Sequence, residues 1–145
     1  MSESKRQTDV GAIAAGHAIY SPAALRIYDA FVLGFSNHLL WRCPTRHLRE
    51  LYDRNLSAVH LDIGVGTGYF LDKAQWRVAT PAITLHDLKE HCLRHAGRRI
   101  ARFRPRMLRA NVLEPLPVGG PFDSVALCYL LHCLPGNLVQ KSVVF

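Results

Sequence analysis

The chain has 145 residues, of which 49% are hydrophobic and 20% are charged, and its formal net charge is +7. This length and balance favour one folded domain with a real core and argue against a disordered chain or two large domains. No apolar run reaches the roughly 18 residues of a transmembrane helix, and the polar start lacks the pattern of a secretory signal, so we expect neither.

The first third of the chain is predicted to be mainly helical. Residues 1–19 are expected to form a flexible leader, and residues 20–55 an N-terminal helical cap. Ser21-Pro22 suits a helix start, because serine can cap and proline fits the first turn. A second helix is expected over about 45–54. The remaining residues, 56–145, are expected to form the main domain.

From residue 56 onward, short apolar runs alternate with helical patterns. The predicted strands, in chain order, are 58–63, 81–87, 106–110 and 122–128, with helices over 69–76 and 88–103 and a last helix opening at Pro135-Gly136. Strands that alternate with helices are typical of βαβ units and a parallel sheet. The predicted fold class is therefore α/β, a doubly wound Rossmann-like parallel sheet.

A glycine-rich segment follows the first predicted strand. Gly64, Gly66 and Gly68 let the backbone turn sharply and approach a ligand, and ligands bind outside the carboxyl ends of parallel strands. The spacing is G-x-G-x-G, not the G-x-G-x-x-G of dinucleotide sites, and the lysine of a phosphate-binding P-loop is absent. Asp62, two residues before Gly64, would repel a diphosphate and attract a cationic amine or sulfonium.

Further candidate ligand contacts follow the next two strands. Asp87 ends the second predicted strand, where a carboxylate can accept hydrogen bonds from both hydroxyls of a ribose. The apolar side chain of Leu88 can pack on an adenine face. After the third strand, Asn111 can accept from an adenine amino group and the Val112 amide can donate to a ring nitrogen. Together these residues predict a site for a cationic nucleoside.

This arrangement resembles the class I S-adenosylmethionine-dependent methyltransferases. The family's motifs are matched in order by Asp62 with Gly64, Gly66 and Gly68, by Asp87, by Asn111, and by the apolar strand that follows Phe122-Asp123. The resemblance covers residues of about 18 to 145 and is closest to small methyltransferases of bacteria and fungi. One departure is Lys89-Glu90-His91, where that group usually carries Asn-Pro-Asn-type residues.

The resemblance implies S-adenosylmethionine as the cofactor, and methyl transfer to a small molecule. The implied cofactor contacts are Asp62, Gly64, Gly66, Gly68, Asp87, Leu88, Asn111 and Val112, with Tyr28 of the helical cap added to them. Candidate walls of the acceptor site are Tyr20, Tyr28, Tyr129 and His132. No general base is assigned, because positioning dominates this chemistry.

The family sheet has the strand order 3-2-1-4-5-7-6, and the chain ends after the fourth strand. We therefore expect only the N-terminal half of that sheet, in the order 3-2-1-4, with the fourth strand at an edge. An exposed apolar edge can pair with another chain, so a homodimer through residues 122–131 is expected. The alternative function is a catalytically inactive, truncated methyltransferase-like protein that binds cofactor or self-associates.

Other features of the sequence have simpler interpretations. His91 and His95 lie four residues apart, but no third ligand is nearby, so we expect no metal site. The segment 94–109 holds seven arginines and no acid. We favour a solvated helix face for this segment over nucleic-acid binding, because aromatic residues are not interleaved with the arginines. The four cysteines show no zinc-type pairing, and we expect reduced thiols in a cytoplasmic protein.

Overall fold

A computed structural model of the chain describes residues 43–117 and 119–145. The predicted leader, most of the helical cap, and the candidate residues Tyr20 and Tyr28 lie outside the described residues. Among the helices of the described part, none is long and apolar enough to cross a membrane.

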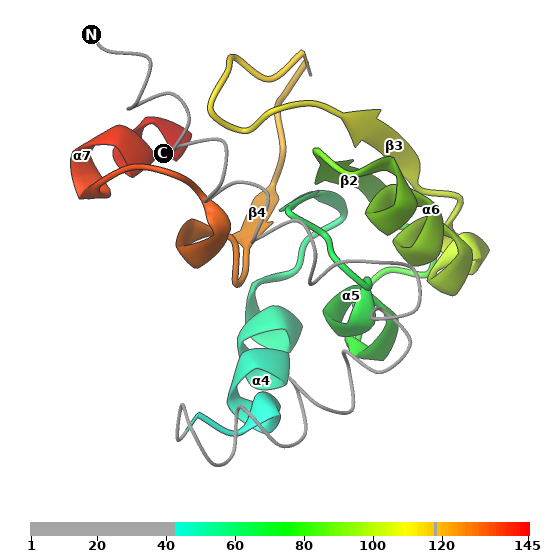
Figure 1. Cartoon of the computed structure of the whole chain (residues 1–145). Helices are drawn as coiled ribbons and strands as arrows, with labels where there is room; N and C mark the ends of the chain where they lie inside the picture. Colours follow the sequence, from blue (N-terminus) through cyan, green and yellow to red (C-terminus); the bar gives the residue numbers. More distant parts are fainter. Residues whose placement is uncertain (1–42, 118) are drawn as a thin grey trace, which may run out of the picture.

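The centre of the molecule is a four-stranded parallel sheet with the order β3-β2-β1-β4 (Figure 1). The strands are β1 (Val59–Ile63), β2 (Ala82–Asp87), β3 (Arg106–Arg109) and β4 (Ser124–Leu127). The predicted α/β class and the predicted strand order 3-2-1-4 are confirmed. In the register of β1 and β2, Asp62 pairs with Leu85 and Ile63 with His86.

Three helices cover one face of this sheet. They are α4 (Thr45–Asn55), α5 (Tyr69–Lys73) and α6 (Glu90–Arg99). The short 3-10 helix η2 (Ala101–Phe103) continues the chain from α6 toward β3. Helix α5 joins β1 to β2 and helix α6 joins β2 to β3 as βαβ units. The carboxyl ends of β1 and β2 therefore lie at the same edge of the sheet.

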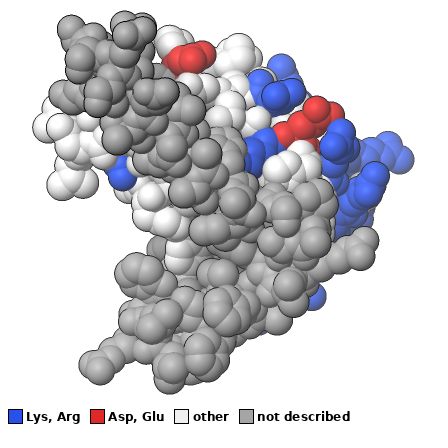
Figure 2. Space-filling model, in the orientation of Figure 1, with Lys and Arg blue, Asp and Glu red and all other residues white. Residues whose placement is uncertain are grey.

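The arginine-rich segment lies on α6, η2 and β3. Figure 2 shows Lys and Arg side chains gathered on this side of the molecule. Acids neutralise part of the charge, since Arg94 contacts Glu90 and Arg102 contacts Asp72, each at 2.6 Å. The side chains of Arg94, Glu90 and Arg102 are about half exposed, whereas that of Asp72 is 18% exposed. The solvated helix face remains the favoured interpretation.

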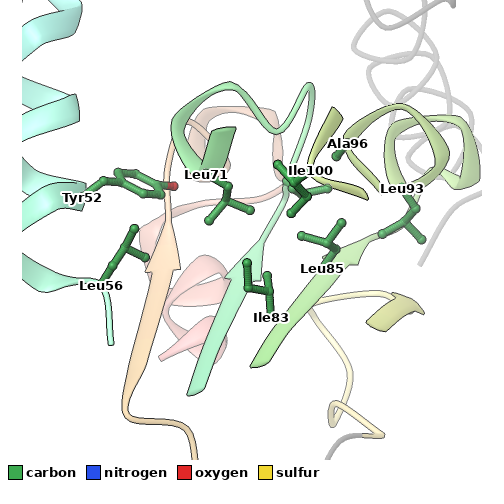
Figure 3. Packing of buried hydrophobic residues seen from close by; sticks show 9 residues of the cluster. Tyr52, Leu56, Leu71, Ile83, Leu85, Leu93, Ala96 and Ile100 are labelled. Carbon is green, nitrogen blue, oxygen red and sulfur yellow. The ribbon is translucent and has the colours of Figure 1, made fainter. Parts of the chain in front are cut away.

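The main hydrophobic core lies between the sheet and the three helices (Figure 3). Apolar residues at alternate positions of β2, Ile83 and Leu85, point to this face because strand side chains alternate. Leu93 and Ala96 meet them from α6 at a helical spacing of three residues. Leu85 is completely buried, so this packing fixes β2 and α6 relative to each other.

The opposite face is covered by irregular segments. Leu61 and Ile63 of β1 pack against buried Val112 of the β3–β4 connection, with partly buried apolar residues from this connection and from the segment after β4 around them. That segment contains η3 (Leu131–Cys133), α7 (Leu138–Lys141) and η4 (Ser142–Val144).

The structure corrects several predicted boundaries. The helix expected over 88–103 breaks at Ile100, which is completely buried and has non-helical backbone angles. The helix expected over 69–76 ends at Lys73. The last helix begins at Leu138 and not at Pro135, because the Asn137 side chain caps it by accepting from the Gln140 amide.

The fourth strand also differs from its prediction. It spans only 124–127, and the side chain of Val125 is 58% exposed, although the sequence has the apolar character of a buried central strand. Val125 is exposed because β4 lies at the edge of the described sheet, where β1 is its one neighbouring strand.

Candidate functional site

A tight bend over residues 64–68, here called the glycine bend, joins β1 to α5. Its start is tied to the end of β2, because the amides of Gly64 and Val65 both donate to the carbonyl oxygen of His86, at 2.8 and 3.2 Å. The Gly68 amide then donates to the carbonyl oxygen of Val65 at 3.0 Å. The bend therefore lies at the carboxyl ends of β1 and β2, where parallel sheets bind their ligands.

The three glycines of the bend have different surroundings, although all have positive φ, at 73°, 54° and 70°. A Cβ on Gly64 would lie 3.0 Å from Leu130, and a Cβ on Gly68 would lie 2.9 Å from the Cβ of Ala96. Among the residues that the structure describes, a Cβ on Gly66 would have only the carbonyl oxygen of Gly64 near it, at 4.0 Å. Gly66 is thus the glycine whose outer side is open to an approaching ligand.

Asp87 lies directly beside this open position. One carboxylate oxygen accepts from the amide of Gly66 at 3.3 Å, and the other accepts from the amide of Lys89 at 2.9 Å. Burial raises the pKa of Asp87, and these two amide donors oppose the rise. The two amides also hold the carboxylate in one orientation. The arrangement can bind a ligand that offers a pair of hydroxyl groups next to an exposed backbone.

Asp62 points into the face of the sheet that α4 covers, and it is only 4% exposed. Its Oδ2 accepts a hydrogen bond from the hydroxyl of Tyr52 at 3.1 Å, and Nε2 of His60 lies 3.6 Å from the same oxygen. Neither Tyr52 nor His60 was predicted from the sequence as a site residue. Strand alternation could have placed His60 on the same face as Asp62, but nothing in the sequence indicates that Tyr52 reaches them.

The remaining predicted contacts are spread along the same edge. Leu88 follows Asp87 and is 48% exposed, so its side chain is accessible. The Asn111 side chain is engaged within its own loop, since its Oδ1 accepts from the amide of Leu113 and its Nδ2 donates to Glu114. The side chain of Val112 is buried in the second core, which leaves its backbone as the predicted contact.

Two candidate wall residues follow β4. Tyr129 has a φ of 57°, an unusual conformation for a bulky residue. Its ring lies 6.4 Å from that of Phe70 in α5, near the glycine bend. His132 is exposed and lines an open hollow of about 310 Å³ formed by residues of the C-terminal segment. No residue of the glycine bend lines that hollow, so it is separate from the site around Gly66 and Asp87.

Comparison with curated proteins finds methyltransferases. The chain is 46% identical over 129 residues to the demethylluteothin O-methyltransferase of Streptomyces thioluteus, covering 88% of this chain and 56% of that protein. It is 47% identical over 133 residues to the physcion biosynthesis cluster O-methyltransferase of Aspergillus chevalieri, covering 90% of this chain and 60% of that protein. Over most of its length, the chain is homologous to methyltransferases.

The similarity to methyltransferases extends beyond these two relatives. The relatives include the N-methyltransferase vrtF of Penicillium aethiopicum, which is 41% identical over 106 residues and covers 72% of this chain and 44% of that protein. No protein-family model matches the chain. The 3-2-1-4 parallel sheet is consistent with the class I type that the sequence resembles.

The alignments also show how much of each relative the chain matches. The chain spans 56% and 60% of the length of the two O-methyltransferases named above. The names of those relatives describe methyltransferases, and they give no support to the alternative of a catalytically inactive protein.

Proposed function

We propose that this chain contains the cofactor-binding part of an S-adenosylmethionine-dependent methyltransferase that acts on a small molecule. The observation that carries the proposal is the hydrogen bond from the Gly66 amide to Asp87 at 3.3 Å. This hydrogen bond connects Gly66, whose outer side is open to a ligand, with Asp87, the carboxylate at the end of β2. The alignments with O- and N-methyltransferases supply the reaction class.

The residues around the glycine bend fit such a cofactor. The Asp87 carboxylate is proposed to accept hydrogen bonds from the ribose hydroxyls, and exposed Leu88 to pack on the adenine. The open side of Gly66 leaves room for the nucleoside where any other residue would place a Cβ. Asp62 is proposed to attract the ammonium group of the amino-acid end.

Two further contacts are proposed on the adenine. The Val112 amide is proposed to donate to a ring nitrogen. The Asn111 side chain is proposed to accept from the adenine amino group, which requires its Oδ1 to be shared with or released from the Leu113 amide. When bound, the cofactor supplies a methyl group made electrophilic by the cationic sulfur. The role of this chain is then to orient that group toward the acceptor.

Isothermal titration calorimetry with S-adenosylhomocysteine tests the proposal. We expect binding by the unmodified chain, and a loss of about 100-fold in Asp87→Asn because two hydrogen bonds to a charged acceptor are weakened. Asp123→Asn is the matched control, since Asp123 is exposed and precedes β4. It should bind with unchanged affinity. Equal affinity of Asp87→Asn and the unmodified chain would contradict the ribose assignment.

Self-association through β4 is proposed as a second property. The strand lies at the end of the described sheet, and the residues from β4 onward expose six large apolar side chains, namely Val125, Leu131, Leu138, Val139, Val143 and Phe145. Such a patch next to an open strand edge is a template for pairing. Light scattering during gel filtration should detect a dimer that Val125→Lys weakens. A stable monomer at micromolar concentration would contradict this.

A further inference from the structure

A chain of polar side chains links Asp62, near the start of the glycine bend, to helix α4 and to strand β4. The Tyr52 hydroxyl of α4 donates to Oδ2 of Asp62 at 3.1 Å, and His60 approaches the same oxygen from within β1. On its other side, Nδ1 of His60 lies 2.8 Å from the hydroxyl of Ser124 in β4. The amide of Ser57 donates to that hydroxyl at 3.0 Å. The Asp62 carboxylate is thus linked to α4 directly through Tyr52, and to β4 indirectly through His60.

The direction of each contact follows from the chemistry of the groups. Burial, together with the charge of Asp62, raises the pKa of Tyr52 well above its usual value, so the phenol remains a donor. Ser124 receives the Ser57 amide and can donate its own proton to Nδ1 of His60. This favours the tautomer of His60 with its proton on Nε2, the nitrogen that faces Asp62 at 3.6 Å. Both neighbours then present a hydrogen to the same oxygen.

Tyr52 also links the carboxylate to the helix that follows the bend. Its ring stacks on that of Phe70 in α5, with 5.0 Å between centroids and 20° between planes. The His60 ring is held edge-on by Trp76, with 5.9 Å between centroids. The rings of both residues are therefore fixed by packing, which prevents the Asp62 carboxylate from rotating freely.

From this geometry we infer that Tyr52 and His60 are positioning residues, which orient the Asp62 carboxylate toward the ammonium group of an amino-acid-bearing nucleoside. The inference rests on the proposed function, because it concerns the same site. It adds a basis for specificity: the site distinguishes nucleosides that carry an amino-acid end from those that lack one. Asp62 is two residues before Gly64, at the end of β1 that leads into the glycine bend.

Two ligands separate this role from a merely structural one. S-adenosylhomocysteine carries the amino-acid end, whereas 5′-methylthioadenosine has the same nucleoside and lacks that end. Tyr52→Phe removes the hydroxyl and keeps the ring that stacks on Phe70. By calorimetry, we expect it to weaken S-adenosylhomocysteine about tenfold, the factor that corresponds to roughly 1.4 kcal/mol. The affinity for 5′-methylthioadenosine should stay the same.

A double-mutant cycle tests whether Tyr52 acts through Asp62. In an Asp62→Asn background, where the carboxylate charge is gone, adding Tyr52→Phe should cause no further loss of S-adenosylhomocysteine affinity. Tyr69→Phe is the matched control, since it removes a hydroxyl from the helix next to the bend and not from Asp62. It should leave both affinities unchanged. Thermal melting of each variant verifies that it is folded.

The possible outcomes separate the two proposals. If Tyr52→Phe weakens both ligands equally, or if its effect persists in Asp62→Asn, the positioning role is wrong while the proposed function stands. If the unmodified chain binds neither ligand, the proposed function fails and the inference fails with it. A selective loss of S-adenosylhomocysteine binding that disappears in the Asp62→Asn background supports the inference.

Discussion

The unit from β1 to β3 and the segment after β4 differ sharply in how they bury apolar residues. In the first unit, Leu85 and Ile100 are completely buried and Leu93 is 2% exposed. In the second, the side chains of Leu138 and Phe145 are 85% and 88% exposed. The glycine bend and Asp87 belong to the first unit, which explains how their geometry can be fixed while much of the second region stays exposed.

The two regions meet at the glycine bend. Leu130, from the second region, lies against Gly64, whereas Gly66 and Asp87 are held entirely by the first. The comparison therefore predicts that mutations in the packed unit change both stability and ligand binding. Mutations of the exposed apolar side chains should change neither very much.

The largest expected difference concerns stability. Leu85→Ala should lower the free energy of unfolding by about 3 kcal/mol, because it opens a cavity in the main core. Leu138→Ala should change that free energy by less than about 0.5 kcal/mol, since the side chain is mostly solvated already. Urea denaturation followed by circular dichroism measures both. Similar losses in the two variants would show that the second region is packed more tightly than described.

A smaller contrast distinguishes two glycines within the bend. Gly68→Ala combines a positive φ with a 2.9 Å approach to Ala96, and it should cost roughly 3 kcal/mol of stability. Gly66→Ala has a positive φ but open space, and it should cost only about 1–2 kcal/mol.

Ligand affinity provides the second readout for this pair. At temperatures where both variants are folded, Gly66→Ala should lose more S-adenosylhomocysteine affinity than its small loss of stability would explain. The reason is that its Cβ occupies the open side of the bend. Gly68→Ala should lose mainly stability. Thermal melts with and without ligand separate the two effects, and equal ligand-induced shifts in both variants would contradict the assignment of Gly66 as the open position.

The last predicted effect is a dependence of affinity on pH. Because burial raises the pKa of Asp87, its carboxyl should take up a proton at a higher pH than an ordinary aspartate does. S-adenosylhomocysteine affinity should then fall by ~tenfold per pH unit below that raised pKa, as the charged acceptor is lost.

The raised pKa of Asp87 also makes the stability of the fold depend on pH, but in the opposite direction to the affinity. Between the pKa of Asp87 in the unfolded chain and its raised value in the folded chain, the folded state binds more protons, so the free energy of unfolding falls as pH rises. Asp87→Asn removes both effects and is the control. A titration series in which affinity stays constant through this range in the unmodified chain would contradict the role of Asp87.

Much of this architecture could be predicted from the sequence because it follows local patterns. The apolar run before Gly64 and the acid at Asp87 mark strand ends, and the strand order that the family resemblance implied is confirmed. The break in the helix at Ile100 could not be predicted, because it depends on the burial of Ile100 in the main core and not on helix propensity. The start of α7 depends on capping by Asn137, a signal that Pro135-Gly136 obscured.

The site shows the same division. The spacing of Gly64, Gly66 and Gly68 predicted a bend at a strand end, but it could not show that only Gly66 is open. That difference depends on Leu130 and Ala96, which come from elsewhere in the chain. The contact of Tyr52 with Asp62 was missed for a related reason: it joins a helix to a strand by packing, and no sequence pattern encodes it.

A crystal structure of the chain with S-adenosylhomocysteine tests the central claim most directly. We predict electron density for the nucleoside across the open side of Gly66, with both ribose hydroxyls within hydrogen-bonding distance of the Asp87 carboxylate. Density for the ligand elsewhere, with the space beside Gly66 filled by protein side chains, would contradict it.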